Sequence, residues 1–131
     1  MLSRRGFVAC WICAAGGFAA ADAGAQTPGL KRTVLTKIDG PIEGYETINA
    51  KVEIDAGFAI ARHTHPGVES TLVLEGGLTL DIEGKGSLAL APGQAFQVPP
   101  STPHGGKNGD AKSVLSATYI VEKGKPLASP A

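Results

Sequence analysis

Apolar residues alternate with polar ones along most of the chain after residue 30, with a period of two. In the clearest run, residues 48–54 read Ile-Asn-Ala-Lys-Val-Glu-Ile, so the apolar side chains fall on one face of an extended chain. This pattern predicts a half-buried antiparallel strand. Similar patterns predict further strands over residues 33–38, 58–65, 70–74, 78–83, 87–90, 95–98 and 114–121.

Turn-forming residues separate these runs. Glycine, proline and aspartate gather at residues 55–57, 66–67, 76–77, 84–86, 92–93, 99–103 and 105–110. Short strands at this spacing, with no helical period between them, predict a single all-β domain, a sandwich or a barrel, over residues 30–124. We expect the segments on either side, residues 26–30 and the C-terminal tail 125–131, to be loose.

The first 25 residues do not fit the strand pattern and predict an export signal. Arg4 and Arg5 precede an apolar run over residues 8–21, and Ala-Gly-Ala ends at residue 25. A positive region, an apolar region and small residues at a cleavage site, in this order, are typical of a secretory signal peptide. The arginine pair followed by Gly-Phe also resembles the twin-arginine export motif. We therefore expect a periplasmic or secreted protein; the alternatives are an ordinary signal, a membrane-anchored chain or a lipoprotein.

Charge and cysteine content exclude several other classes. The 131 residues carry 12 basic and 12 acidic side chains, so the chain lacks the basic stripe that nucleic-acid binding requires. After residue 25 no apolar segment reaches the roughly 20 residues that span a bilayer. Cys10 and Cys13 both lie in the predicted signal, so we expect no disulfide in the mature protein and no redox role for their C-x-x-C spacing.

The three histidines and one glutamate form the strongest chemical signal in the chain. His63 and His65 are two residues apart on a predicted strand, so their side chains share one face. Glu69 follows the turn at Pro66, and we expect a hairpin there to place its carboxylate opposite the two imidazoles. His104 follows a proline-rich segment. Three imidazoles and one carboxylate suit a divalent transition metal; the alternative is a hydrogen-bonded structural pair of histidines.

Two motifs in this region resemble those of the cupin superfamily. The first cupin motif, G-x5-H-x-H-x3-E-x6-G, matches residues 57–76 at every interval. The second, G-x5-P-x-G-x2-H-x3-N, matches residues 93–108, except that Ser101 stands where the family usually has glycine. The resemblance implies a double-stranded β-helix, or jelly-roll barrel, with a metal near one mouth of the barrel. The metal ligands that it implies are His63, His65, Glu69 and His104.

Strand phase makes further predictions about individual side chains. We expect the wall of the pocket to be small and apolar, formed by Ala59, Ala61, Thr71, Val73 and Phe96. We expect Arg62, Glu75, Asp81 and Glu83 to face solvent, and Tyr45, Tyr119 and Phe58 to pack in the core rather than contact a substrate.

A metal site of this kind leaves three function classes open. The first is an oxygen-dependent enzyme resembling the quercetin-type dioxygenases, the second a lyase or isomerase that uses the metal as a Lewis acid, and the third a non-catalytic binding module. Open coordination positions favour an enzyme that acts on a small molecule. Glu69 is the candidate catalytic base, a role that the resemblance to some cupins implies.

The expected cofactor is one divalent transition metal. Export by the twin-arginine route would favour iron or manganese, which are available in the cytoplasm, while nickel, cobalt, copper and zinc are the alternatives. No cluster of basic residues predicts a nucleotide or phosphate substrate. We expect a homodimer formed through edge strands, as is common in the family.

Overall fold

The computed structural model describes residues 27–131, and these residues form ten strands and no helix. The strands are β1 (Leu30–Asp39), β2 (Tyr45–Ile54), β3 (Ala59–Thr64), β4 (Gly67–Glu75), β5 (Leu78–Ile82), β6 (Gly86–Leu90), β7 (Ala95–Val98), β8 (His104–Asn108), β9 (Ser113–Glu122) and β10 (Ser129–Pro130). Within this part of the chain no helix is present that could cross a membrane. The predicted export signal, residues 1–25, lies outside the described residues.

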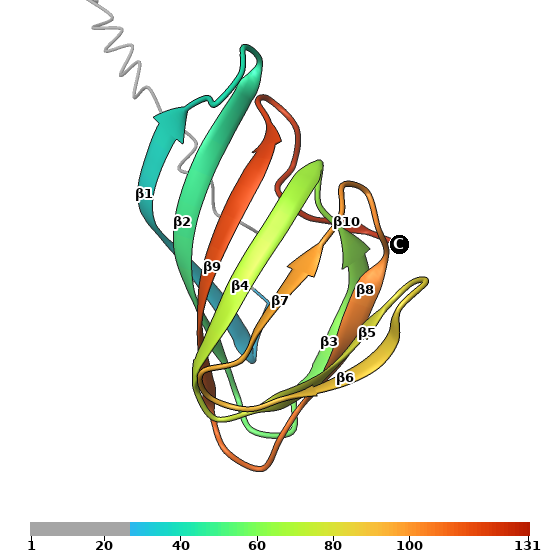
Figure 1. The fold of residues 1–131 in the computed structure, drawn as a ribbon. Coiled ribbons are helices and arrows are strands. Elements are labelled where there is room, and N and C mark those ends of the chain that lie inside the picture. The colour runs from blue at the N-terminus through green and yellow to red at the C-terminus, as the bar shows by residue number, and fades with distance from the viewer. Residues whose placement is uncertain (1–26) are drawn as a thin grey trace, which may run out of the picture.

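The strands form two antiparallel sheets that face each other (Figure 1). One sheet has the order β1-β2-β9-β4-β7, and the other has the order β10-β3-β8-β5-β6. Apart from the consecutive pairs β1–β2 and β5–β6, neighbouring strands in each sheet are not consecutive in the sequence, as in a jelly roll. The predicted all-β jelly-roll fold is confirmed.

The strand pattern of β2 shows how the sequence builds the core. Buried and partly exposed residues alternate along all ten positions of β2, and β9 shows the same alternation. The two strands pair in continuous register from Tyr45–Glu122 to Ile54–Ser113, so their apolar faces form one surface directed at the opposite sheet. The buried apolar residues of both sheets are Ile48, Ala50, Val52, Ile54, Val73, Leu78, Leu80, Ile82, Phe96, Val98, Leu115, Ala117, Tyr119 and Val121.

Each predicted strand corresponds to an observed strand, but the predicted turn over residues 105–110 is largely wrong. His104–Asn108 is β8, which lies between β3 and β5. Its glycines allow close approach of the neighbouring strands: a Cβ at Gly106 would lie 2.1 Å from the Thr79 carbonyl oxygen, and one at Gly105 would lie 2.8 Å from that of Ile60. These glycines therefore mark close packing inside a sheet, not a turn.

The connection at Pro66 also differs from the prediction. It is not a hairpin, because β3 and β4 belong to opposite sheets and β4 pairs with β9 and β7. Gly67 lies directly against β9, where a Cβ would come within 1.9 Å of the Ile120 carbonyl oxygen. The chain therefore crosses from one sheet to the other at this point, so Glu69 lies opposite the histidines, as predicted, but approaches them from the other sheet and not across a hairpin.

The C-terminal tail is not loose. Ser129 and Pro130 pair with Thr64 and His63 and form β10 at the edge of the second sheet. Leu127 packs against the core. The sequence shows no alternation over this short segment, so its docking depends on contacts with β3 that local pattern does not reveal.

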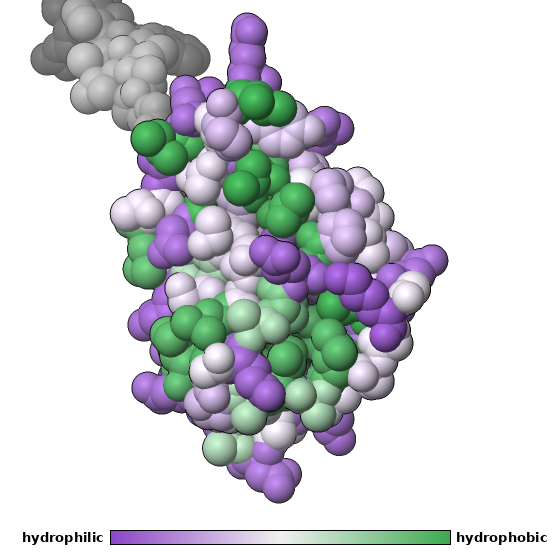
Figure 2. Space-filling view, viewed as in Figure 1, coloured by the Kyte–Doolittle hydropathy of each residue, from purple (hydrophilic) through white to green (hydrophobic). Residues whose placement is uncertain are grey.

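On the face shown in Figure 2, apolar side chains form several groups with polar ones between them. The large apolar side chains that are exposed are Val34, Leu35, Ile38, Ile42, Leu72 and Leu74. The first four belong to β1, an edge strand, and to the loop that follows it.

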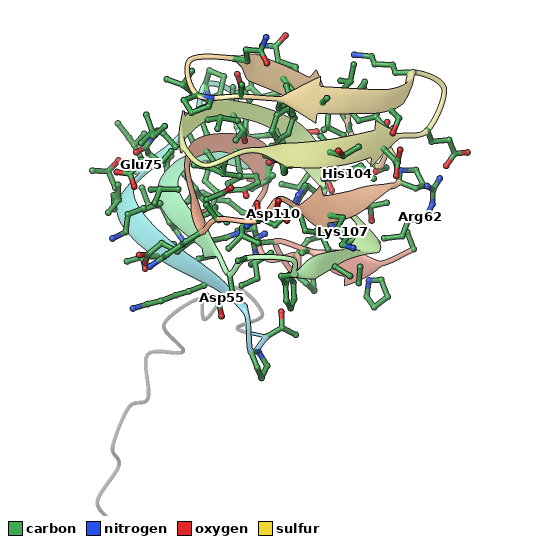
Figure 3. The ribbon with its side chains drawn as sticks, turned by 90° about the horizontal axis from the view of Figure 1, so that it is seen from below. Asp55, Arg62, Glu75, His104, Lys107 and Asp110 are labelled. Carbon is green, nitrogen blue, oxygen red and sulfur yellow. The ribbon has the colours of Figure 1, made fainter. Side chains whose placement is uncertain are left out.

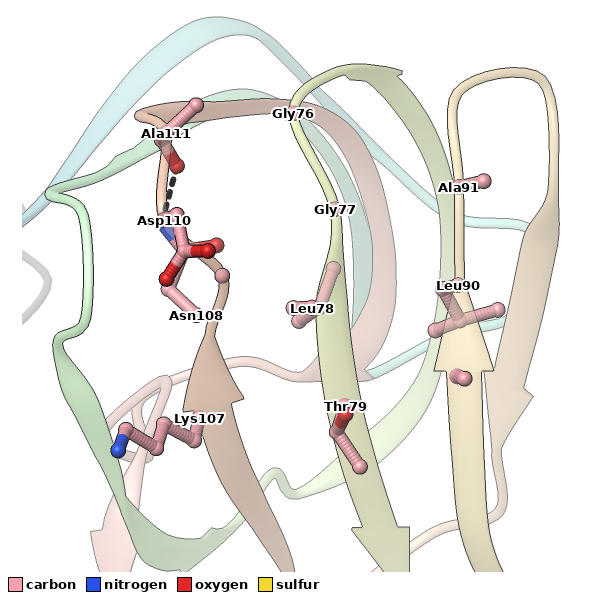
Figure 4. Close-up of a pocket in the computed structure, with 12 residues that line it drawn as sticks. Gly76, Gly77, Leu78, Thr79, Leu90, Ala91, Lys107, Asn108, Asp110 and Ala111 are labelled. Carbon is pink, nitrogen blue, oxygen red and sulfur yellow. Dashed lines mark hydrogen bonds between the residues drawn. The ribbon is translucent and has the colours of Figure 1, made fainter.

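Asn108, the last residue of the second motif, holds one end of the barrel together. Its side-chain amide lies within 3.1 Å of the carbonyl oxygens of Ile54, Asp55 and Ala111, and its Oδ1 accepts a bond from Ser113 Oγ at 2.6 Å. Figure 4 shows the bond to Ala111. The side chain is buried and joins the ends of β2 and β8 to the start of β9.

We predict that Asn108→Ala lowers the free energy of unfolding by about 2–4 kcal/mol, because it leaves several buried polar groups without partners. Asn49→Ala is the matched control: its amide makes one bond, to Thr118 Oγ1, in a half-buried place, and its loss should cost about 1 kcal/mol or less. Urea unfolding of both variants measures the difference. Equal effects would show that the Asn108 network does not stabilise this end of the barrel.

Candidate metal centre

Four side chains from three strands and one connection meet at a single point inside the barrel. His63 lies on β3, His65 just after it, Glu69 on β4 and His104 at the start of β8. One ligand atom from each of them lies within 4.8 Å of all the others. His63 and His104 are direct neighbours in the pairing of β3 with β8, and Figure 3 shows His104 inside the barrel. All four candidate residues therefore come together in a group that could hold a metal ion.

Backbone carbonyl groups fix the orientation of two imidazoles. His63 Nδ1 lies 2.8 Å from the Ala61 carbonyl oxygen, and His104 Nδ1 lies 2.9 Å from that of Thr102. Because a carbonyl oxygen only accepts, each Nδ1 carries the proton and donates it. The neutral rings then present the lone pair of Nε2, which is the form that binds a metal.

The third imidazole is fixed by the C-terminal segment. His65 Nδ1 donates to the Leu127 carbonyl oxygen at 2.6 Å, across 62 positions of sequence. Sequence reasoning did not identify Leu127, because the contact uses its main chain and no side-chain pattern marks it. The docked tail is therefore part of the site.

The loop that carries Ser101 also contacts this region. The Ser101 N–H donates to the His65 carbonyl oxygen at 3.0 Å. Ser101 has a φ of 53°, a left-handed conformation that explains why glycine is usual at this place in the family motif. The serine adopts the backbone shape that a glycine would adopt.

Glu69 faces the histidines with one carboxylate oxygen and is held in place by the other. Its Oε2 lies 3.0 Å from His65 Nε2 and 3.1 Å from His104 Nε2. Thr71 Oγ1 donates to Oε1 at 2.8 Å. Burial alone would raise the pKa of Glu69, but its contacts with His104 and His65 outweigh burial and hold that pKa below its usual range. The carboxylate is therefore ionised when a proton or a cation lies between it and these imidazoles.

The donor set fits a cation. His65 Nε2 is buried and has no hydrogen-bond partner within the described part of the chain, although a carboxylate oxygen lies 3.0 Å away. With Nδ1 as the donor, Nε2 and the carboxylate are both acceptors and cannot bond to each other. A proton or a metal ion between them satisfies both groups, and three nitrogen donors with one oxygen donor suit a divalent transition metal.

The pocket wall differs from the prediction on β3. The pairing of β3 with β8 is interrupted between Ile60 and His63, and this bulge reverses the strand phase. Ile60 therefore faces inward with His63, whereas Ala59 and Ala61 are exposed. Ala59 lines neither of the two cavities beside the candidate ligands, so its predicted place in the pocket wall is wrong, whereas Ala61 lines the outer one, as predicted.

On the other sheet, the one that contains β4 and β7, the predicted pocket wall is confirmed for one residue and not for two others. Phe96 lines the inner cavity, as predicted. Thr71 and Val73 are buried, but neither is among the residues that line the cavity; Thr71 supports Glu69 from behind. Phe58 packs against the core and also lines the outer chamber.

The outward orientation predicted for several charged residues is confirmed. Glu75 and Asp81 are exposed. Arg62 forms an exposed ion pair with Glu83, with Nη2 and Oε2 2.9 Å apart, and points away from the barrel interior in Figure 3. The bulge at residues 61–62 directs this arginine outward.

Two cavities that share part of their wall adjoin three of the four candidate ligands, His63, Glu69 and His104. The inner one, about 30 Å³, is lined by His63, Glu69 and His104 together with apolar side chains, Arg32 and Tyr119. The outer chamber, about 250 Å³, shares Leu30, Arg32, Ile60 and His63 with it and is completed mainly by Phe58 and residues 128–130. The inner space holds about one or two water-sized species, and the outer one can hold a small molecule.

Two residues of this cavity have a role that the sequence analysis did not give them. Tyr119 is 1% exposed and packs in the core as predicted, but its hydroxyl also accepts a bond from Arg32 Nε at 3.1 Å. Arg32 was not identified as a site residue. The available sequence signal was its position two residues after Leu30, on the same face of β1. The structure shows that the side chain is buried although it is charged.

The largest cavity, about 580 Å³, lies elsewhere, between the β5–β6 hairpin and the end of β8 (Figure 4). It is lined mainly by glycines, alanines and other short residues, with Lys107 and Asp110 at its sides. None of the four candidate ligands lines it. Size alone therefore does not identify the chemical site.

We predict that ending the chain at Lys125, which removes the Leu127 carbonyl group, weakens metal binding about 10- to 100-fold, because the orientation of His65 is lost. A chain that ends at Ala128 is the control, since it keeps Leu127 and loses only β10. Competition with a chromophoric chelator measures both affinities. Equal affinity of the two shortened chains would show that the bond to His65 does not matter.

We predict that the metal-free protein loses stability as the pH falls from about 7 to 4. Burial lowers the pKa of His63 from 6.5 to about 4, so over this interval the unfolded chain binds a proton that the folded chain does not. Stability therefore falls with pH, by at most about 1.4 kcal/mol per pH unit for this group. The depressed pKa of Glu69 acts in the same direction below its ordinary value of 4.5.

Urea unfolding at a series of pH values checks this, with His63→Gln beside the wild type. The variant should show a shallower dependence between pH 6.5 and 4. The same slope in both proteins would contradict a partly buried His63 that stays neutral in the folded protein.

Comparisons with known proteins agree with this architecture. A search of curated proteins finds no match. Among solved structures, the chain is similar to an RmlC-like cupin from Shewanella frigidimarina, with a TM-score of 0.61 and 24% identity over 75% of this chain and 81% of that one. It is also similar to the DMSP lyase DddQ from Ruegeria pomeroyi, with a TM-score of 0.64 and 20% identity over 78% of this chain and 51% of that one.

A third similar structure is a salicylate 1,2-dioxygenase from Pseudaminobacter salicylatoxidans, with a TM-score of 0.58 and 18% identity over 71% of this chain and 26% of that one. At these identities the similarities show the fold alone. The sequence model of the cupin domain family matches residues 50–124, more than half of the chain and all four candidate ligands. The chain therefore belongs to the cupin family.

Proposed function

We propose that this cupin is a mononuclear metalloenzyme that acts on a small organic molecule, with oxygen as the second substrate. The observation that carries the proposal is the arrangement of three Nε2 atoms around a buried carboxylate, next to a chamber with room for a small molecule. A site that only bound metal would gain nothing from an adjoining apolar chamber. We propose iron or manganese as the metal.

A divalent ion in this group would supply Lewis acidity and, in octahedral coordination, two adjacent positions for substrate or oxygen. Three neutral imidazoles and one carboxylate would leave such a centre with a net charge of about +1. That charge favours a substrate that coordinates as an anion, such as an enolate.

The residues of the chain divide the remaining work. Glu69 is an ionised carboxylate in a dry site, and Thr71 holds its Oε1 while Oε2 faces the histidines. This places a proton acceptor next to the position of a bound substrate. The apolar side chains of both cavities exclude water and orient the body of the substrate.

A lyase or isomerase reaction without oxygen is the second candidate. The observation in its favour is that, among residues 27–131, Glu69 is the only acidic residue lining the two cavities, so one base faces the substrate directly. The solved structures similar in fold include both a dioxygenase and a lyase. A non-catalytic module that binds metal or a small ligand is the third candidate.

We also propose that the protein works outside the cytoplasm, in the periplasm or as a secreted protein, on the basis of the signal pattern in residues 1–25. Pairing into a homodimer through edge strands is part of the proposal. The exposed apolar side chains of β1, an edge strand, support it.

We predict that the wild-type protein purified from its native compartment contains about one metal ion per chain and that His63→Ala contains less than about one-tenth of that. Arg62→Ala is the matched control, because this neighbouring side chain points outward and pairs with Glu83. Elemental analysis of the three proteins measures the content. Equal metal content in the wild type and in His63→Ala would show that the proposed metal site is wrong.

The reaction class is tested by oxygen consumption with a panel of phenols and enols. We expect turnover that stops when oxygen is removed. Turnover that continues without oxygen would favour the lyase or isomerase, and tight binding without turnover would favour the binding module.

A further inference from the structure

Tyr119 is the direct neighbour of Glu69 on the inner face of the first sheet. The two residues are partners in the pairing of β4 with β9, just as His63 and His104 are partners in the opposite sheet. All four side chains line the inner cavity. The tyrosine and the candidate base therefore face the same small space as the two histidines.

The ring of Tyr119 is held on two sides. Its centre lies 4.9 Å from that of the His65 ring, and its hydroxyl oxygen accepts a hydrogen bond from Arg32 Nε at 3.1 Å. Arg32 also lines the inner cavity, so this bond keeps the hydroxyl group at the cavity wall. Among residues 27–131, Tyr119 is the only residue with a hydroxyl group that lines this cavity.

The hydroxyl group has a proton to donate. The ordinary pKa of tyrosine is about 10, and burial raises the pKa of Tyr119 further, so the group is neutral at physiological pH. Its oxygen accepts the bond from Arg32, but no side chain or backbone group among residues 27–131 accepts its proton. Because a buried donor without an acceptor is unfavourable, a ligand atom with a lone pair is stabilised at this point.

Apart from Arg32 and Tyr119, the polar groups that line the inner cavity are acceptors. In the neutral state His63 and His104 donate their Nδ1 protons to backbone carbonyl groups and present Nε2 lone pairs, and Glu69 presents a carboxylate oxygen. None of these three groups can donate a hydrogen bond to an anionic ligand. Tyr119 supplies the neutral donor that they lack.

We propose that Tyr119 is a further catalytic residue of this site, whose hydroxyl group donates a hydrogen bond to an anionic oxygen atom of the substrate in the inner cavity. The cavity of about 30 Å³ has room for one or two species of the size of a water molecule, while the body of the substrate lies in the larger chamber. This inference rests on the proposed function, because it assigns a further residue to that reaction.

The position beside Glu69 gives the hydroxyl group a defined role. When the Glu69 carboxylate accepts a proton from the substrate, the electron pair left behind becomes negative charge on the substrate oxygen, as in an enolate. A preorganised donor at that oxygen stabilises the charge more than it stabilises the neutral substrate. Tyr119 keeps its own proton, so the only proton transferred is the one that moves from the substrate to Glu69.

The test uses acetohydroxamate, a small stable anion whose two oxygen atoms resemble an enolate and bind divalent metals. Visible absorption of the cobalt(II)-loaded protein measures its affinity. We expect Tyr119→Phe to weaken acetohydroxamate binding at least about tenfold, because a hydrogen bond to a charged group is lost. Cobalt affinity, measured by competition with a chromophoric chelator, should change less than about twofold.

Tyr45→Phe is the matched control. It removes the same hydroxyl group from the other tyrosine of the chain, which lies at the start of β2 and lines neither cavity beside the candidate ligands. Acetohydroxamate affinity should change less than about twofold. A merely structural role of Tyr119 would instead lower the cobalt affinity and the acetohydroxamate affinity by the same factor.

A second measurement needs no substitution of Tyr119. The wild type is loaded with zinc and labelled with ¹³C at Cζ of its two tyrosines, and the spectrum of Tyr45→Phe assigns the two NMR signals. Acetohydroxamate should shift the Tyr119 signal, because the hydroxyl group gains an acceptor, and should leave the Tyr45 signal in place. This measurement decides the question if Tyr119→Phe does not fold.

The proposal is overturned if acetohydroxamate shows no saturable binding to the wild type up to about 10 mM, if the cobalt affinity of Tyr119→Phe falls as much as its acetohydroxamate affinity, or if the Tyr119 signal does not move. Absence of cobalt binding by the wild type would refute the proposed metalloenzyme and this inference together. Cobalt binding with the same acetohydroxamate affinity in Tyr119→Phe and the wild type would refute this inference alone.

Discussion

The structure depends on one electrostatic constraint: three imidazole lone pairs and a carboxylate face one another inside the barrel. Each imidazole donates its Nδ1 proton to a backbone carbonyl oxygen, so in the neutral state none can donate from Nε2 toward Glu69. Four acceptors that meet in a dry place repel one another unless a cation lies between them. The fold holds them there because the carbonyl groups belong to well-anchored main chain. A proton or a metal ion between them satisfies these acceptors, and the four side chains form a group that could hold a metal ion.

The same constraint explains why the ligands come from distant parts of the chain. The pairing of β3 with β8 places His63 beside His104, the crossing at Pro66 brings Glu69 from the opposite sheet, and Leu127 closes the arrangement behind His65. Arg32 and Tyr119, which are hydrogen-bonded to each other, line the same inner cavity as His63, Glu69 and His104. The candidate metal ligands and Arg32 thus lie around the same inner cavity, and they come from several strands.

Much of the fold and the four ligand candidates could be predicted from the sequence, because strand alternation and motif spacing are local properties. The errors arose where tertiary contacts decide the outcome. The bulge after Ile60 reverses the phase of β3, so Ala59 faces solvent although alternation places it on the same face as His63. Gly106 was assigned to a turn because a glycine that permits close strand packing has the same sequence signal. Leu127 acts through its carbonyl group, which no side-chain pattern reveals. Arg32 was overlooked because a single cation on a strand is usually solvated.

The most direct test of the central claim is the protonation and coordination state of the three imidazoles, measured by long-range ¹H–¹⁵N NMR during titration with zinc. The account predicts that one equivalent of zinc shifts the Nε2 resonances of His63, His65 and His104 together, while each Nδ1 keeps its proton. Coordination through Nδ1, or a titration that leaves any of the three rings unchanged, would contradict it.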